Sequence, residues 1–279
     1  MKKINSVLIF TFLSALLVGC GGGATSDPYP PSIQSSTLTY GTQATFYVGV
    51  TTLNLGTTFS ATNCTTLQST VSTVANYITY SCTVTSSGPL VFTGTDANGK
   101  VIATQGFTVP NPQVLISATI GTTPANFVVE LDQPKAPIST DNFLRYVKDG
   151  FYKNTLFHRV IPNFVIQAGG FTSGLANKVP SYSAIALESQ NGLKNIKGSL
   201  AMARTSDPNS ATSQFYINLK DNTNLDYIDA NNPGYTVFGS VISGQSAVDS
   251  IAAVPTGAAS GMTDVPTTEV TITNAIRIQ

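Results

Sequence analysis

Charged residues are scarce in this sequence, and neither sign is in excess. Asp, Glu, Lys and Arg make up 10% of the 279 residues, and 14 basic residues balance 14 acidic ones. In soluble domains, charged residues usually make up about a quarter of the sequence. Because Lys and Arg form no cluster, the chain has no basic field that would hold nucleic acid. The low charge, with many Ser, Thr, Asn and Gly residues, favours an exported bacterial protein over a cytosolic one.

The residues that most enzymes use to break bonds are also scarce. The sequence has no GxSxG, HExxH or P-loop motif. Its one histidine, His158, stands in an apolar run, where we expect a structural role, and no carboxylates cluster there as a glycosidase would require. Neither Cys64 nor Cys82 has a CxxC partner or a nearby histidine, so metal binding and redox catalysis are not expected. We therefore expect an activity that needs no metal or cofactor.

The first 20 residues contain a short apolar segment rather than a membrane span. Residues 7–18 follow a basic start and are too short to cross a bilayer as a stable helix. The sequence Leu17-Val18-Gly19-Cys20, followed by three glycines, resembles the lipobox of bacterial lipoproteins. The resemblance implies that the signal peptide 1–19 is removed and that Cys20 is lipidated. Gly21 implies an outer-membrane location facing the periplasm, if the cell is Gram-negative.

Two alternatives to the lipobox stay open, namely an ordinary signal peptide with a chance cysteine and an uncleaved anchor. If Cys20 is lipidated, the two remaining cysteines, Cys64 and Cys82, are free to pair with each other. Outside the cytosol such a disulfide forms and persists. The alternative is two free buried thiols.

The mature chain divides into two β-rich domains. Residues 20–31 are rich in Gly, Ser and Pro and predict a flexible tether. Residues 32–109 alternate β-branched and aromatic residues with polar ones, with a hairpin turn at 96–100, which predicts a small antiparallel β-sandwich of immunoglobulin-like size. This domain has almost no charged residues, which favours a spacer or a weak binding module. Prolines stiffen the linker 110–112.

The second domain, residues 113–279, combines many short strands with two helices. Apolar periodicity predicts a helix over 140–149, capped by Ser139 or Thr140, and a second over 246–253. Strands are predicted over 127–131, 199–203, 214–219, 236–242 and 270–279. This pattern indicates a mainly β fold, a closed barrel capped by helices, because closure removes exposed sheet edges.

The segment Phe157-His158-Arg159-Val160-Ile161-Pro162 places one of only four arginines in an apolar run. Burying an arginine is costly unless its donors are used. With Gly198–Ala203, Ser213–Ile217, Leu225-Asp226 and Tyr235–Gly239, the segment resembles the motifs of cyclophilins, the peptidyl-prolyl cis/trans isomerases, and especially their bacterial periplasmic branch. The resemblance covers the whole second domain and implies the cyclophilin-like barrel.

The resemblance also assigns roles to individual residues. It implies that Arg159, Gln167 and Phe164 are catalytic. It implies that the proline-containing peptide is bound by Val165, Ala203, Gln214, Tyr216, Leu225 and Tyr235. The chain departs from the family pattern at several of these positions, since Val165 stands for the usual Met, Tyr216 for Phe and Tyr235 for His. Asn224 stands where many members have Trp or Phe, and Asn163 replaces a Gly.

The sequence therefore predicts a lipid-anchored isomerase of X–Pro bonds. Its partners would be proline-containing unfolded or loop segments of exported proteins, and it would be a monomer that binds no nucleic acid. Two alternatives remain open. One is a non-catalytic chaperone module that binds proline peptides, and the other is a surface adhesin that acts through the N-terminal domain.

Overall fold

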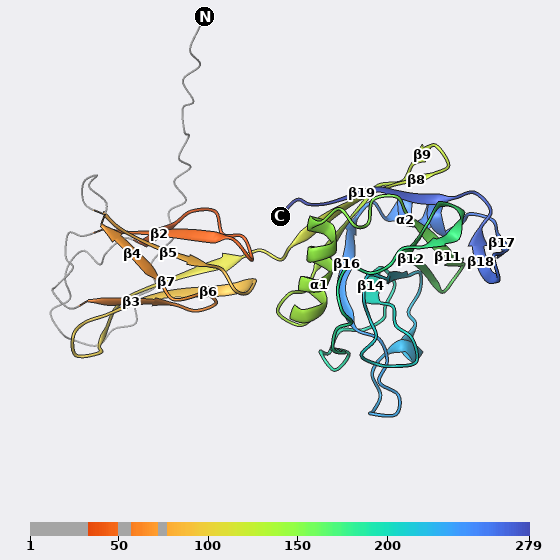
Figure 1. Ribbon diagram of the computed structural model, residues 1–279. Helices are drawn as coiled ribbons and strands as arrows, with labels where there is room; N and C mark the ends of the chain where they lie inside the picture. The colour runs from red at the N-terminus through yellow and green to blue at the C-terminus, as the bar shows by residue number, and fades with distance from the viewer. Residues whose placement is uncertain (1–32, 50–56, 72–76) are drawn as a thin grey trace, which may run out of the picture.

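The computed structural model of the chain describes residues 33–49, 57–71 and 77–279 (Figure 1). The predictions for the signal peptide 1–19, the lipidation site Cys20 and the tether 20–31 lie outside these residues. Within the described ranges, no helix is both long enough and apolar enough to cross a membrane. Two β-rich parts lie beside each other and are joined by one crossing of the chain near residue 110.

The N-terminal part is an antiparallel β-sandwich, as predicted. One sheet has the order β1 (Ile33–Ser35), β2 (Gln43–Gly49), β5 (Tyr77–Thr83) and β4 (Gln68–Val71), and the other has β3 (Thr58–Ala61), β6 (Gly88–Thr95) and β7 (Val101–Val109). Phe46 of the first sheet and Phe92 of the second are fully buried, with ring centroids 4.8 Å apart. A disulfide joins Cys64 and Cys82, so the free-thiol alternative is wrong.

The second part is a closed eight-stranded barrel. Its strands follow the order β10 (Phe127–Leu131), β16 (Val237–Ser243), β14 (Ser199–Met202), β15 (Phe215–Asn218), β12 (Val165–Thr172), β11 (Thr155–Ile161), β19 (Val270–Arg277) and β8 (Gln113–Ile120). Antiparallel pairing of β8 with β10 closes the ring. Two short strands, β9 (Thr123–Pro124) and β13 (Ala176–Asn177), pair antiparallel with β8 and β12, respectively. The predicted fold class is therefore confirmed.

Two helices cover the barrel. In α1 (Pro137–Lys148), Phe143, Tyr146 and Val147 are buried, which is the predicted face, and in α2 (Gln245–Ala252) Val248 and Ile251 are buried. Several aromatic rings of the core meet edge to face, as Phe143 does with Phe215, with ring centroids 5.4 Å apart. Such pairs add to the burial of apolar area.

The predicted start and cap of the first helix are wrong. Helix α1 begins at Pro137, and Ala136, at the N-cap, makes no side-chain cap. Instead, the Glu188 carboxylate accepts hydrogen bonds from the Ile138 and Ser139 N–H groups, at 2.9 and 2.8 Å. A carboxylate at a helix N-terminus satisfies free N–H groups and the helix dipole. A cap supplied from 50 residues away leaves no local sequence pattern.

The sequence also failed to predict a hairpin near the C-terminus. Strands β17 (Thr256–Ala259) and β18 (Met262–Pro266) pair with each other, and β18 packs beside β11. Single-turn 3-10 helices occur at η1 (Ser173–Leu175) and η2 (Thr223–Leu225). The hairpin matters for the site because β11 carries Arg159.

Candidate active site

Arg159, Gln167 and Tyr216 lie in one row across three neighbouring strands. Arg159 of β11 is the cross-strand partner of Gln167 on β12, and Gln167 is the partner of Tyr216 on β15. Tyr216 in turn pairs with Ala201 on β14. Directly opposed residues project on the same face of a sheet. The next residues along, Ile166, Ile217 and Leu200, belong to the barrel core, so the row lies on the outer face.

An apolar cluster, separate from the barrel core, borders this row. Val165, Ala201, Tyr216 and Val237 are its buried members. Its partly buried members are Phe164, Leu193, Ala203, Leu225 and Tyr235. Six residues that the sequence assigned to the site therefore meet in one cluster (Phe164, Val165, Ala203, Tyr216, Leu225 and Tyr235). Ala201, Leu193 and Val237 were not among the assigned residues. We call these nine residues the outer cluster.

The Tyr216 hydroxyl, which the usual Phe would lack, has a partner. It donates a hydrogen bond to Asn195 Oδ1 at 2.8 Å, and burial raises the pKa of Tyr216 well above its ordinary value. The ring of Tyr235 meets that of Tyr216 nearly at a right angle, with centroids 5.8 Å apart. Tyr216 is thus a neutral, fixed aromatic surface within the outer cluster.

Three buried asparagines lie behind the outer cluster. Asn195 Nδ2 donates to the Leu225 carbonyl at 3.1 Å, and Asn222 Nδ2 donates to the Phe164 carbonyl at 2.9 Å. Asn218 joins them, because its Nδ2 donates to Asn195 Oδ1 and its Oδ1 accepts from Asn222. Buried amides are stable only when hydrogen-bonded. This asparagine network ties the chain segments that carry Phe164 and Leu225 to strand β15.

The two glutamines assigned to peptide binding contact each other. Gln167 Nε2 donates to Gln214 Oε1 at 2.9 Å. Gln214 packs closely over Gly170, where an added Cβ would lie 2.5 Å from the Gln214 amide. Ala203 lies next to Gln214, and its N–H donates to the Gln214 carbonyl at 3.0 Å. The sequence suggested that the Ala203 backbone is available to a peptide, but its N–H is already used within the protein.

Arg159 stands at the exposed end of the row. Its side chain is 39% exposed, and its Nε lies 3.9 Å from Asp264 Oδ2 on β18. An ion pair this exposed contributes little to stability. Arg159 thus lies directly across from Gln167 on the neighbouring strand, with its guanidinium accessible from outside. Asp264 was missed by sequence reasoning because the hairpin that carries it was missed.

His158, the neighbour of Arg159 on β11, is 4% exposed and packs on Phe171 at 4.6 Å. Burial lowers the pKa of His158 to about 4, so the ring is neutral at physiological pH. The expectation of a structural histidine agrees with this position.

Arg204 is a further residue of the site that the sequence did not single out. Its guanidinium lies 4.4 Å from the centroid of the Tyr235 ring, and its Nε and Nη2 donate to the Gly234 carbonyl. Gly234 has φ +60°, and an added Cβ would lie 2.5 Å from the Asp226 carbonyl carbon. Arg204 thereby fixes the Tyr235 wall of the outer cluster. The available signal was its position directly after the Gly198–Ala203 motif.

No group of three or more His, Cys, Asp or Glu side chains that would hold a metal ion occurs within residues 33–49, 57–71 and 77–279. The site combines an apolar surface, two amides and an accessible guanidinium. Such a surface is suited to binding and polarising a peptide rather than cleaving it.

Comparison with known proteins identifies the family. Residues 117–277 match the family model for cyclophilin-type peptidyl-prolyl cis-trans isomerases. A peptidyl-prolyl cis-trans isomerase of Acinetobacter baylyi is 54% identical over 131 residues, which is 47% of this chain and 69% of the relative. Isomerase B of Escherichia coli is 45% identical over 156 residues, covering 55% of this chain and 94% of the relative.

The fold is also similar to that of a solved structure of this family. A cyclophilin-type isomerase of Cryptosporidium parvum, crystallised in the presence of the dipeptide Ala-Pro, is 28% identical with a TM-score of 0.50, covering 60% of this chain and 99% of its own. The family model spans more than half of the present chain. The chain therefore belongs to the cyclophilin-type peptidyl-prolyl cis-trans isomerases, and residues 117–277 form its isomerase domain.

Proposed function

We propose that the chain accelerates X–Pro isomerisation by binding the proline ring on the outer cluster and donating a hydrogen bond from Arg159 to the prolyl nitrogen. The observation that supports this most directly is the row of Arg159, Gln167 and Tyr216 across β11, β12 and β15. The row places a guanidinium, an amide and a buried aromatic ring beside one another on a rigid sheet.

The chemistry requires no bond to break. The barrier is the partial double bond of the X–Pro amide, about 18–20 kcal/mol. A donor that approaches the prolyl nitrogen localises its lone pair, which weakens amide resonance and stabilises the twisted transition state. Arginine suits this role because its guanidinium stays charged and transfers no proton.

The remaining side chains hold the peptide while the bond turns. Phe164, Val165 and Tyr216 supply the surface for the proline ring, with Leu225 and Tyr235 at its rim. Gln167 and Gln214, which already contact each other, grip the flanking backbone together with the Ala203 carbonyl. Val165 is smaller than the family's usual Met, so the surface is shallower there.

Substitution of Arg159 tests the mechanism. In a protease-coupled assay on an X–Pro tetrapeptide, Arg159→Ala should lower kcat/KM at least about tenfold, or about 1.4 kcal/mol of barrier. KM should change less than kcat if the donor acts in the transition state. The control is Arg145→Ala, on helix α1 outside the site. Full activity of Arg159→Ala would remove the arginine from the mechanism.

The proposed setting is the cell envelope, with clients among exported proteins. The lipobox-like segment Leu17–Cys20 supports a lipid anchor. In a Gram-negative cell, Cys20 would be lipidated and the chain would face the periplasm from the outer membrane. Labelling with radioactive palmitate, followed by membrane fractionation, tests this setting. The wild type should be labelled and Cys20→Ser should not, and equal labelling of both would contradict the anchor.

A further inference from the structure

A buried glutamine connects the isomerase domain to the sandwich. Gln133, just before α1, is 4% exposed. Its Oε1 accepts hydrogen bonds from the Ser87 N–H at 3.0 Å and the Ser86 hydroxyl at 2.9 Å, both in the loop between β5 and β6. The Ser87 hydroxyl also donates to Asn111 Oδ1 in the linker, at 2.8 Å. Each of these hydrogen bonds contributes only a modest net free energy to the contact, because water would satisfy the same groups if the two parts separated.

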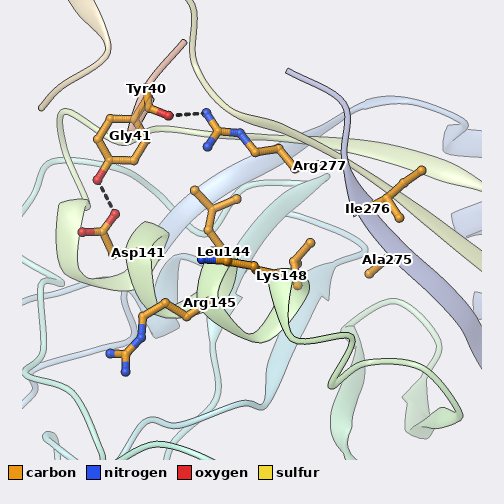
Figure 2. A pocket seen from close by; sticks show the side chains of 10 residues that line it. Tyr40, Gly41, Asp141, Leu144, Arg145, Lys148, Ala275, Ile276 and Arg277 are labelled. Atoms are coloured by element: carbon orange, nitrogen blue, oxygen red, sulfur yellow. Dashed lines mark hydrogen bonds between the residues drawn. The ribbon is translucent and has the colours of Figure 1, made fainter. Parts of the chain in front are cut away.

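A second set of contacts involves Tyr40, in the segment before β2. Its hydroxyl donates a hydrogen bond to the Asp141 carboxylate on α1, and its carbonyl accepts one from Arg277 Nη2 at 2.7 Å (Figure 2). Burial, together with the Asp141 carboxylate, raises the pKa of Tyr40, so the hydroxyl remains protonated and able to donate. Tyr40 is thus held at both its side chain and its backbone by residues of the isomerase domain.

The apolar part of the contact is small. Leu144 of α1 packs against the cores of both domains, and Pro134 lies next to Gly88. Beside Leu144, a cavity of about 520 Å³ opens between the Tyr40 segment, α1 and the end of β19. The contact therefore consists mainly of hydrogen bonds around this cavity. Polar interfaces of this kind between domains usually permit domain motion.

The linker opposes such motion. Only residues 110–112 separate β7 from β8, and Pro112 is buried with its carbonyl accepting from the Leu131 N–H at 2.9 Å. A short tether keeps the effective concentration of the two faces high, so weak contacts suffice to keep them together. Two prolines further restrict the backbone at this point.

We propose that the sandwich is the dedicated partner of the isomerase face formed by Gln133, α1 and the end of β19, and that the two domains move as one body. The sandwich then acts as a rigid arm between the N-terminal segment and the barrel, rather than as a domain that moves independently on a flexible linker. None of the contact residues named above belongs to the outer cluster. The arm would therefore orient the peptide-binding surface without covering it.

Backbone ¹⁵N relaxation on the chain from Gly21 onward tests this proposal. Amides of residues 33–49 and 113–279 should share one rotational correlation time. The double variant Tyr40→Phe, Gln133→Ala removes the side-chain hydrogen bonds to Asp141, Ser86 and Ser87 and leaves only Arg277 bound to the Tyr40 carbonyl. The correlation time of the smaller, N-terminal part should then fall below that of the barrel. Tyr47→Phe, at a half-exposed tyrosine on β2, is the matched control and should leave the times equal.

Different correlation times in the wild type would overturn the proposal, and so would a double variant that still tumbles as one body. Isomerase activity of the double variant should equal that of the wild type, because the outer cluster is untouched. If activity were absent in both proteins, the proposed mechanism would be at fault while the relaxation result still decided the docking.

Discussion

Asn195 should be far more important to this fold than the hydroxyl of Tyr216 that it binds. The Asn195 side chain accepts hydrogen bonds from Tyr216 and Asn218 and donates to the Leu225 carbonyl and the Asp226 carboxylate. Asn195→Ala removes all four and leaves the Tyr216 hydroxyl buried without that partner. A net loss of about 1 kcal/mol for each of the other three bonds, with about 1–3 kcal/mol for the orphaned Tyr216 hydroxyl, predicts a destabilisation of about 4–6 kcal/mol.

Tyr216→Phe removes one hydrogen bond and leaves Asn195 Oδ1 with Asn218 as a donor, at 3.2 Å. The predicted cost is about 1 kcal/mol, because no buried donor is orphaned. The variant keeps the aromatic surface and should keep most of its activity. Asn195→Ala frees the Leu225 segment and should lower kcat/KM about tenfold, chiefly through KM.

Urea unfolding followed by fluorescence and circular dichroism measures these stabilities, and the protease-coupled assay measures the activities. Asn231→Ala, at an exposed asparagine of the same region, is the control and should change stability by less than about 0.5 kcal/mol. If Asn195→Ala costs no more than Tyr216→Phe, the asparagine network does not support the outer cluster and the reasoning is wrong.

Three further predictions concern stability. His158 has a folded-state pKa of about 4, below its unfolded value of 6.5, so the unfolded chain binds the proton more tightly and stability is lost as pH falls below 6.5. The free energy of unfolding should drop by about 2 kcal/mol from pH 7 to pH 5 on this account, and His158→Phe should remove most of that slope. Replacing Cys64 and Cys82 by Ser should destabilise the sandwich by about 3 kcal/mol, as expected for a loop of 18 residues. This difference between the variant and the wild type should be seen under oxidising conditions and should vanish when both proteins are reduced. Glu188→Ala should cost about 1–2 kcal/mol and Glu188→Gln less, and equal losses would exclude a charge effect at the start of α1.

The sequence predicted the barrel, the sandwich and most strands because period-two alternation and turn residues are local properties. Its errors lie where distant segments meet. The cap of α1 comes from Glu188, and Arg159 is paired by Asp264 on a hairpin whose small residues, such as Gly257 and Ala258, give no clear alternation. Neither contact can be read from neighbouring positions.

In the site, too, local motifs were predicted and contacts between distant residues were not. The outer cluster gathers six of the nine residues to which the cyclophilin resemblance assigned a role. Two of its members, Val165 and Tyr216, lie on the paired strands β12 and β15. The asparagine network behind it was not predicted, because Asn195, Asn218 and Asn222 look like ordinary loop and strand-end residues in the sequence. Their role depends on being buried, which only the folded chain shows.

The most direct test of the central claim is NMR exchange spectroscopy on an X–Pro peptide at equilibrium, without a coupling protease. Catalytic amounts of the chain should produce exchange cross-peaks between the cis and trans signals, with their ratio unchanged, and Arg159→Ala should weaken these cross-peaks strongly. Shifts of the peptide signals without faster exchange would show a protein that binds proline peptides and does not isomerise them, which would contradict the account.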